Sequence, residues 1–123
     1  MSGAVSGHAP RVFVIAGEAS GDKLGAALMA GLRDLAPGVE FAGIGGAEMT
    51  AAGLTSLFDM QELSLMGLVE ILPKYFHLKR RIRETAAAAL EFAPDVVVTI
   101  DSPDFCLRLA RLFRAASRAP VVH

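Results

Sequence analysis

The sequence predicts an α/β fold: a doubly wound, mostly parallel sheet of the Rossmann-like type. Short apolar runs alternate with longer amphipathic stretches along all 123 residues, as strands alternate with helices in such folds. The run Val96–Ile100 has no charge or turn residue, which is typical of a strand at the centre of a parallel sheet. A loop with glycines, residues 17–22, directly follows the first apolar run, as at a strand-to-helix turn.

The first half of the chain divides at its glycines and prolines. A strand over Arg11–Ala16 precedes a helix from about Gly21 to Leu35, which Pro37-Gly38 ends. The following elements are a strand at Val39–Gly43, a helical turn at Glu48–Ala52, an edge strand at Leu54–Phe58 and a helix at Glu62–Leu72, which Pro73 breaks or kinks.

The second half begins with a long helix over Lys74–Phe92, whose apolar residues recur at spacings of three and four. These residues are Tyr75, Leu78, Ile82, Ala86 and Ala89. Next come a strand at Asp95–Ile100, a helix at Pro103–Ser117 and the start of a fifth strand at Pro120–His123. Ser102 suits the cap of the last helix and Pro103 its first position, while Asp104 places a negative charge in the first turn.

Composition excludes several classes of site. Cys106 is the single cysteine, so neither a disulfide framework nor a thiolate metal cluster is expected. His8, His77 and His123 lack ligand spacing, and we expect no metal. A net charge of −1 gives no overall attraction to nucleic acid. The 53% hydrophobic content and the mean hydropathy of +0.46 indicate a buried sheet and favour a sticky face for a partner domain or a lipid.

The ends of the chain suggest a part of a larger protein. Residues 1–10 form a flexible leader that lacks the basic start of a signal peptide. No apolar stretch approaches the ~20 residues that span a bilayer, so a cytoplasmic protein, or one attached to a membrane from that side, is expected. Because the last apolar run stops at His123, we expect residues 11–123 to be an incomplete domain.

Asp101 is the strongest candidate site residue, since it immediately follows the run of the central strand. If the strand order is 3-2-1-4-5, the first and fourth strands are neighbours and a ligand crevice opens between their carboxyl ends. The loop with Glu18 and Ser20 would then meet Asp101 at that crevice. Asp101 has a structural alternative as a helix cap.

The glycine loop carries an acid and a hydroxyl, which favour contact with a sugar or an acceptor over a pyrophosphate. Gly17, Gly21 and Gly25 are spaced by four, so the dinucleotide fingerprint is absent. Ser20 has an alternative role as a helix cap, and Asp22 has one as a first-turn charge. Glu18 has no such structural role. The turn at Gly43–Gly46 lies at the same sheet edge and could admit the close approach of a ligand.

We interpret two basic stretches as the solvent-exposed faces of amphipathic helices. One comprises Lys79, Arg80, Arg81 and Arg83, and the other comprises Arg108, Arg111, Arg114 and Arg118 on one helical face. The alternative is contact with anionic lipid headgroups, with Leu65–Val69 as an apolar patch beside Lys74, Lys79 and Arg80.

Three motifs, in this order, resemble those of bacterial lipid-A-disaccharide synthase: Ala16–Asp22, Met66–Glu70 and Pro94–Phe105. The resemblance runs from about Arg11 to the last residue. It implies an inverting, GT-B-type glycosyltransferase of lipid A and lipopolysaccharide biosynthesis. Such an enzyme has two Rossmann-like domains, uses no metal or other cofactor, and is peripheral on the cytoplasmic side of the inner membrane.

The resemblance also implies substrates and roles. UDP-2,3-diacylglucosamine and 2,3-diacylglucosamine 1-phosphate would give the disaccharide 1-phosphate and UDP. Asp101 would be the general base, while Glu18, Ser20, Gly17 and Gly21 would bind substrate on the acceptor side. The second, UDP-sugar-binding domain is absent from these 123 residues, so we expect this chain alone to be inactive. Two alternatives are another two-domain sugar transferase with a soluble acceptor and a non-catalytic α/β binding module.

Overall fold

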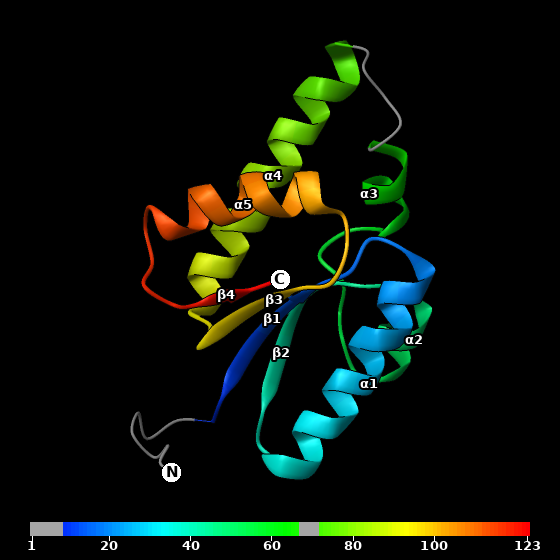
Figure 1. Cartoon of the computed structure of the whole chain (residues 1–123), viewed down its shortest axis with the longest axis vertical. Coiled ribbons are helices and arrows are strands. Elements are labelled where there is room, and N and C mark those ends of the chain that lie inside the picture. The colour runs from blue at the N-terminus through cyan, green and yellow to red at the C-terminus, as the bar shows by residue number, and fades with distance from the viewer. Residues whose placement is uncertain (1–8, 67–71) are drawn as a thin grey trace.

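The computed structural model describes residues 9–66 and 72–123, which form a four-stranded parallel sheet with helices on both faces (Figure 1). The strands are β1 (Arg11–Ile15), β2 (Glu40–Ile44), β3 (Val96–Thr99) and β4 (Val121–Val122), in the order β2-β1-β3-β4. β1 pairs with β2 on one side and with β3 on the other. Its residues from Val12 to Ile15 are at most 4% exposed, as expected of a central parallel strand.

The helices form two layers. The elements are α1 (Ala19–Leu35), α2 (Ala47–Ala51), α3 (Gln61–Met66), α4 (Leu72–Phe92) and α5 (Pro103–Arg114). Val12 and Val14 pack with Met29 of α1 and Met49 of α2 on one face, while Phe13 and Ile15 pack with residues of α4 and α5 on the other. This alternation along β1 confirms the predicted doubly wound architecture.

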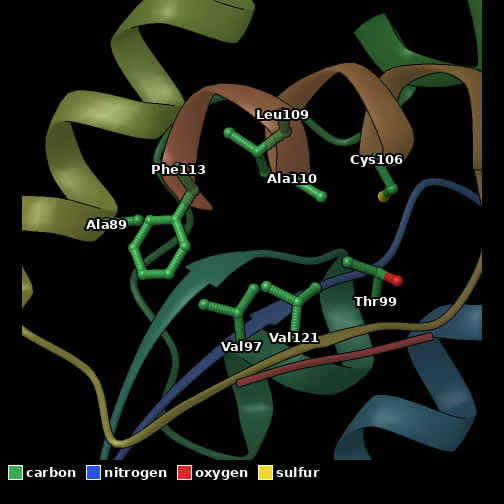
Figure 2. Close-up of a pocket in the computed structure, with 8 residues that line it drawn as sticks. All are labelled: Ala89, Val97, Thr99, Cys106, Leu109, Ala110, Phe113 and Val121. Carbon is green, nitrogen blue, oxygen red and sulfur yellow. The ribbon is translucent and has the colours of Figure 1, made fainter. Parts of the chain in front are cut away.

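The packing of α5 on the sheet is tight. Figure 2 shows Val97 of β3 and Val121 of β4 facing Leu109 and Phe113 of α5. The space that they line has no room for a water molecule. Burying side chains of this size contributes roughly 1.5–3 kcal/mol each, so this layer holds α5, and the loop that leads into it, in place.

The chain reverses its direction of winding at β1. It first goes outward to β2 and then returns to add β3 and β4 on the opposite side of β1. This order confirms the prediction that the first strand, β1, lies next to the strand that contains Val96, β3. The loops that follow β1 and β3 therefore leave the same edge of the sheet side by side, and Figure 1 shows them there.

The strand predicted at Leu54–Phe58 is wrong. Only one isolated parallel bridge, between Ser56 and Gly43, joins this segment to β2. The Ser56 hydroxyl accepts the N–H of Gly45 at 3.1 Å and donates to the carbonyl of Phe58 at 2.6 Å. These local side-chain bonds replace a strand ladder, and the buried Leu54 and Phe58 anchor the segment at its two ends.

Several boundaries also differ from the predictions. α1 begins at Ala19, earlier than predicted, and α5 ends at Arg114 rather than Ser117. α4 begins at Leu72, so that Pro73 lies in its first turn, where a missing N–H costs nothing. The predicted helix over residues 62–72 is α3 up to residue 66. Residues 1–8 of the leader, and most of the apolar patch at 65–69, lie outside the described residues.

Candidate functional site

The loop after β1 presents Glu18 and Ser20 to solvent, since both residues are exposed. Glu18 is extended, with φ −138° and ψ 162°, and occupies the N-cap position of α1 without a capping bond from its side chain. Its carbonyl accepts the N–H of Asp22 at 2.9 Å. The alternative in which Ser20 caps the helix is therefore wrong, because Ser20 lies inside the first turn.

Asp101 binds this loop directly. Its Oδ1 accepts the N–H of Gly17, and its Oδ2 accepts the N–H of Glu18 at 3.1 Å. The hydroxyl of Ser102 donates to Oδ1 at 3.2 Å. The predicted meeting of the two loops is thus confirmed, and one half-buried carboxylate joins them across the carboxyl edge of the sheet.

Gly17 and Gly21 give Asp101 its space. A Cβ atom on Gly21 would overlap Oδ2 of Asp101, and one on Gly17 would overlap the hydroxyl of Ser102. Neither position can carry a side chain unless the Asp101 carboxylate or its neighbour moves. The glycines at these two sequence-predicted positions therefore fit the close approach of a carboxylate from the chain itself.

Ser102 holds an unusual backbone conformation beside Asp101. It is the N-cap residue of α5, as predicted, but with φ 56° and ψ 56° it is left-handed, and its side chain makes no capping bond. A left-handed residue other than glycine costs roughly 1–2 kcal/mol. The Ser102 hydroxyl instead donates to the Asp101 carboxylate. The N-cap side chain of α5 therefore stabilises Asp101 and not the first turn of the helix.

Asp22 has a role that sequence analysis missed. It lies in the first turn of α1, but its buried carboxylate accepts three backbone N–H groups at the start of α2, all at 2.9 Å. The donors are Gly46, Glu48 and Met49. Since the N–H of Gly45 binds Ser56, two donors of the Gly43–Gly46 turn are used within the chain. The sequence feature nearest to this role of Asp22 is the second glycine turn, Gly43–Gly46, which a short helix follows.

His123 is a second residue that the sequence does not single out, because it lacks the spacing of a metal ligand. It follows β4 and lines an open hollow of about 400 Å³ together with Thr99, Ile100, Asp101 and Leu107. Its Nδ1 lies within hydrogen-bond distance of the hydroxyl of the buried Thr99. The sequence feature that indicates His123 is its position directly after a strand whose carboxyl end lies at the same sheet edge as Asp101.

Cys106 is buried on the face of α5 that packs against the sheet (Figure 2). Burial raises the pKa of its thiol to about 12, and the negative charge of Asp101 adds to the effect. The thiol donates to the carbonyl of Asp101 at 3.3 Å. Because a nucleophilic cysteine acts as a thiolate, Cys106 is a packing residue rather than a reactive one.

Within residues 9–66 and 72–123, no group of three or more His, Cys, Asp or Glu side chains is arranged to hold a metal ion. No described helix is both long and apolar enough to cross a membrane.

Comparison with known proteins identifies relatives of this chain. The family model for lipid-A-disaccharide synthetase matches residues 12–123. The lipid-A-disaccharide synthase of Ruegeria pomeroyi is 64% identical over 118 residues, which are 96% of this chain and 29% of the relative. That of Rhodospirillum centenum is 54% identical over 114 residues, 91% of this chain and 28% of the relative.

A more distant relative is the probable mitochondrial lipid-A-disaccharide synthase of Arabidopsis thaliana. It is 45% identical over 106 residues, which are 85% of this chain and 23% of the relative. The chain thus spans less than a third of the length of these curated relatives. The family model nevertheless covers nearly all of the chain, including the β1 loop and Asp101. The chain belongs to the lipid-A-disaccharide synthetase family.

Proposed function

We propose that this chain is the acceptor-side part of an inverting glycosyltransferase of lipid A biosynthesis. The complete enzyme joins UDP-2,3-diacylglucosamine to 2,3-diacylglucosamine 1-phosphate and releases UDP. The observation that carries the proposal is the anchored carboxylate of Asp101 at the switch point of a chain that belongs to this family.

Asp101 acts as the general base in this proposal. The 6-hydroxyl oxygen of the acceptor attacks the anomeric carbon of the donor while its proton passes to the Asp101 carboxylate. The new C–O bond forms as the bond from the anomeric carbon to the diphosphate breaks, and UDP leaves with that electron pair. The N–H groups of Gly17 and Glu18 fix the carboxylate in one orientation, which favours proton transfer in a defined geometry.

Glu18 and Ser20 bind the acceptor sugar in this proposal. Both side chains are exposed in the loop that Asp101 contacts, and no hydrogen bond among the described residues employs either of them. A carboxylate and a hydroxyl suit the hydroxyl groups of a sugar. Gly17 and Gly21 contribute by leaving room for Asp101 at this position.

The UDP-sugar site belongs to a second Rossmann-like domain. This domain corresponds to the part of the relatives that this chain does not match. The chain alone is then inactive, and the complete enzyme works without a cofactor at the cytoplasmic surface of the inner membrane, where its acylated substrates reside. Residues 1–10 are the leader, and residues 11–123 belong to the first domain.

A chimera tests the proposal. The 118 matching residues of the Ruegeria pomeroyi relative are replaced by those of this chain, and disaccharide formation and UDP release are measured with the two acylated substrates. We expect the chimera to form product and the 123-residue chain alone to form none. A chimera that folds but releases no UDP would overturn the proposal, and one that uses only soluble acceptors would point to a different sugar transferase.

The role of Asp101 is tested in the same chimera by comparing Asp101→Asn with Asp22→Asn. Each change weakens a carboxylate that binds backbone N–H groups. General-base catalysis contributes about 10²–10⁴-fold, so kcat should fall by at least about 100-fold in Asp101→Asn alone. Equal losses in the two variants would assign Asp101 a structural role.

A further inference from the structure

A groove between α4 and α5 gathers positive charge, and Asp101 is not among the residues that line it. It has a volume of about 350 Å³ and is lined by Lys79, Ile82, Arg83, Arg108, Arg111 and Leu112. Figure 1 shows α5 lying across α4, and the two helices are in contact. Each helix contributes two cations and one aliphatic side chain, and no acidic residue is among the lining residues.

The structure separates residues that looked equivalent in the sequence. Of the four arginines predicted on one face of the last helix, Arg108 and Arg111 line the groove. In the other basic stretch, the Arg81 guanidinium binds Glu62 at 2.9 Å and Glu84 at 2.9 Å. Of the four cations in this run, Arg81 is neutralised by carboxylates and Arg80 binds the His77 ring, while Lys79 and Arg83 line the groove.

Two of the groove cations, Arg83 and Arg111, are not paired with acidic side chains as Arg81 is. Among the described side chains, no carboxylate lies within 4.0 Å of the guanidinium groups of Arg83 and Arg111. Lys79 and Arg108 each take part in another interaction within the chain. Like charges that face one another on packed helices are destabilising, and a bound anion would remove this cost.

We propose that this groove binds a phosphate group, either free in solution or carried on a lipid headgroup. The planar guanidinium forks of Arg83 and Arg111 match the oxygens of a phosphate, and the two helices present them from opposite sides. Ile82 and Leu112, the latter 43% exposed, add an apolar surface beside the charges. The volume lies within the range of sites for small molecules. The site includes none of the residues proposed for glycosyl transfer.

Two probes and two double variants of the 123-residue chain test this site. The probes are inorganic phosphate, followed by the shift in unfolding temperature, and phosphatidylglycerol–phosphatidylcholine vesicles, followed by co-sedimentation at 0.15 M salt. R83Q/R111Q removes two groove cations, whereas R114Q/R118Q removes two exposed cations that do not line the groove. The two variants lose the same charge, and both change only exposed side chains, so both should fold.

We expect R83Q/R111Q to weaken binding roughly 30-fold, because each cation contributes about a fivefold factor. R114Q/R118Q should weaken binding by about threefold at most, since separated exposed charges are screened at this salt concentration. Binding of vesicles without an effect of inorganic phosphate would identify a lipid headgroup as the source. The reverse would identify a soluble phosphate. Equal weakening by the two variants, or binding of neither probe by the unaltered chain, would overturn the proposal.

Discussion

Asp22 and Asp101 bind backbone N–H groups in the same chemical way but in different surroundings. Asp22 is 5% exposed and accepts three N–H groups from the start of α2. Asp101 is half-buried, accepts two N–H groups and one hydroxyl, and borders an open hollow. Both therefore use about three of the four acceptor sites of a carboxylate. Only Asp101 keeps its remaining site where a ligand can reach it.

The difference shows that the number of hydrogen bonds does not distinguish a structural carboxylate from a candidate catalytic one. α2 has only five residues and no side-chain cap of its own, so its free N–H groups require Asp22. Asp101 instead joins two loops at the carboxyl edge, where open α/β sheets bind ligands. Its surroundings, rather than its bonding, favour a role in chemistry.

The largest effect on stability is expected from Asp22→Ala. Removing the carboxylate leaves three N–H groups without acceptors, at least one of them buried, and should lower the free energy of unfolding by about 3–5 kcal/mol. The exposed Asp34 on the same helix provides the control, since Asp34→Ala should change stability by at most about 0.5 kcal/mol. Urea unfolding of the two variants measures the difference. A loss below about 1 kcal/mol in Asp22→Ala would contradict the structural role.

A second pair of variants tests the space around Asp101. Gly21→Ala places a methyl group against the Asp101 carboxylate and should cost about 1–3 kcal/mol despite the better helix propensity of alanine. Gly31→Ala lies on the same helix with nothing within 4 Å of the new methyl group. It should therefore stabilise the chain by about 0.5–1 kcal/mol. Thermal unfolding separates the two, and a stabilising Gly21→Ala would show that Asp101 has freedom to move.

A third pair concerns backbone strain. Ser102 and Ala93 both have positive φ, at 56° and 54°. Replacing either with glycine should stabilise the chain by about 1 kcal/mol, because glycine adopts this conformation without steric cost. Ser102→Gly also removes the hydroxyl that binds Asp101, so its gain should be smaller than that of Ala93→Gly. Equal gains in urea unfolding would mean that the hydroxyl contributes nothing to holding Asp101.

The sequence predicts the features that depend on strong periodicity. β1 is buried on both faces, and β3 is buried on one face and partly buried on the other. Both strands therefore have continuous apolar runs, and α4 carries a clear apolar stripe. The meeting of Asp101 with the β1 loop follows from topology, since both loops leave the same sheet edge at the switch point. The family resemblance adds the chemistry that we propose for this edge.

The features that the sequence does not predict depend on distant contacts. Asp22 reaches N–H groups 24 to 27 residues away, and nothing within its own helix indicates this. Ser20 has the residue type of a cap, but α1 begins one residue before it. Leu54–Phe58 has apolar residues at its two ends like a strand, but the hydroxyl of Ser56 turns the backbone. In each case a tertiary or side-chain bond outweighs the local preference.

The smallest effect is expected at Glu62, a third carboxylate, which is bound by side-chain cations instead of backbone N–H groups. Burial alone would raise the pKa of Glu62, but hydrogen bonds from Arg81 and His77 outweigh it, and the pKa lies below its ordinary value. The folded chain thus binds this proton more weakly than the unfolded chain does. The stabilisation is fully present above a pH of about 4.5 and is lost as the pH falls through the lower, folded pKa.

Glu62→Gln should therefore destabilise the chain by at most about 1 kcal/mol at pH 7, as is usual for partly exposed ion pairs, and by less at pH 3. Urea unfolding of both chains at the two pH values gives this double difference, in which the titration of all other carboxylates cancels. Glu40→Gln is the control, because its carboxylate lies 3.7 Å from Arg11 and is 54% exposed. If the penalty of Glu62→Gln is the same at pH 3 as at pH 7, the side chain of Glu62 acts through packing rather than through its charge. The larger effect on stability expected for Asp22 would then reflect only its deeper burial.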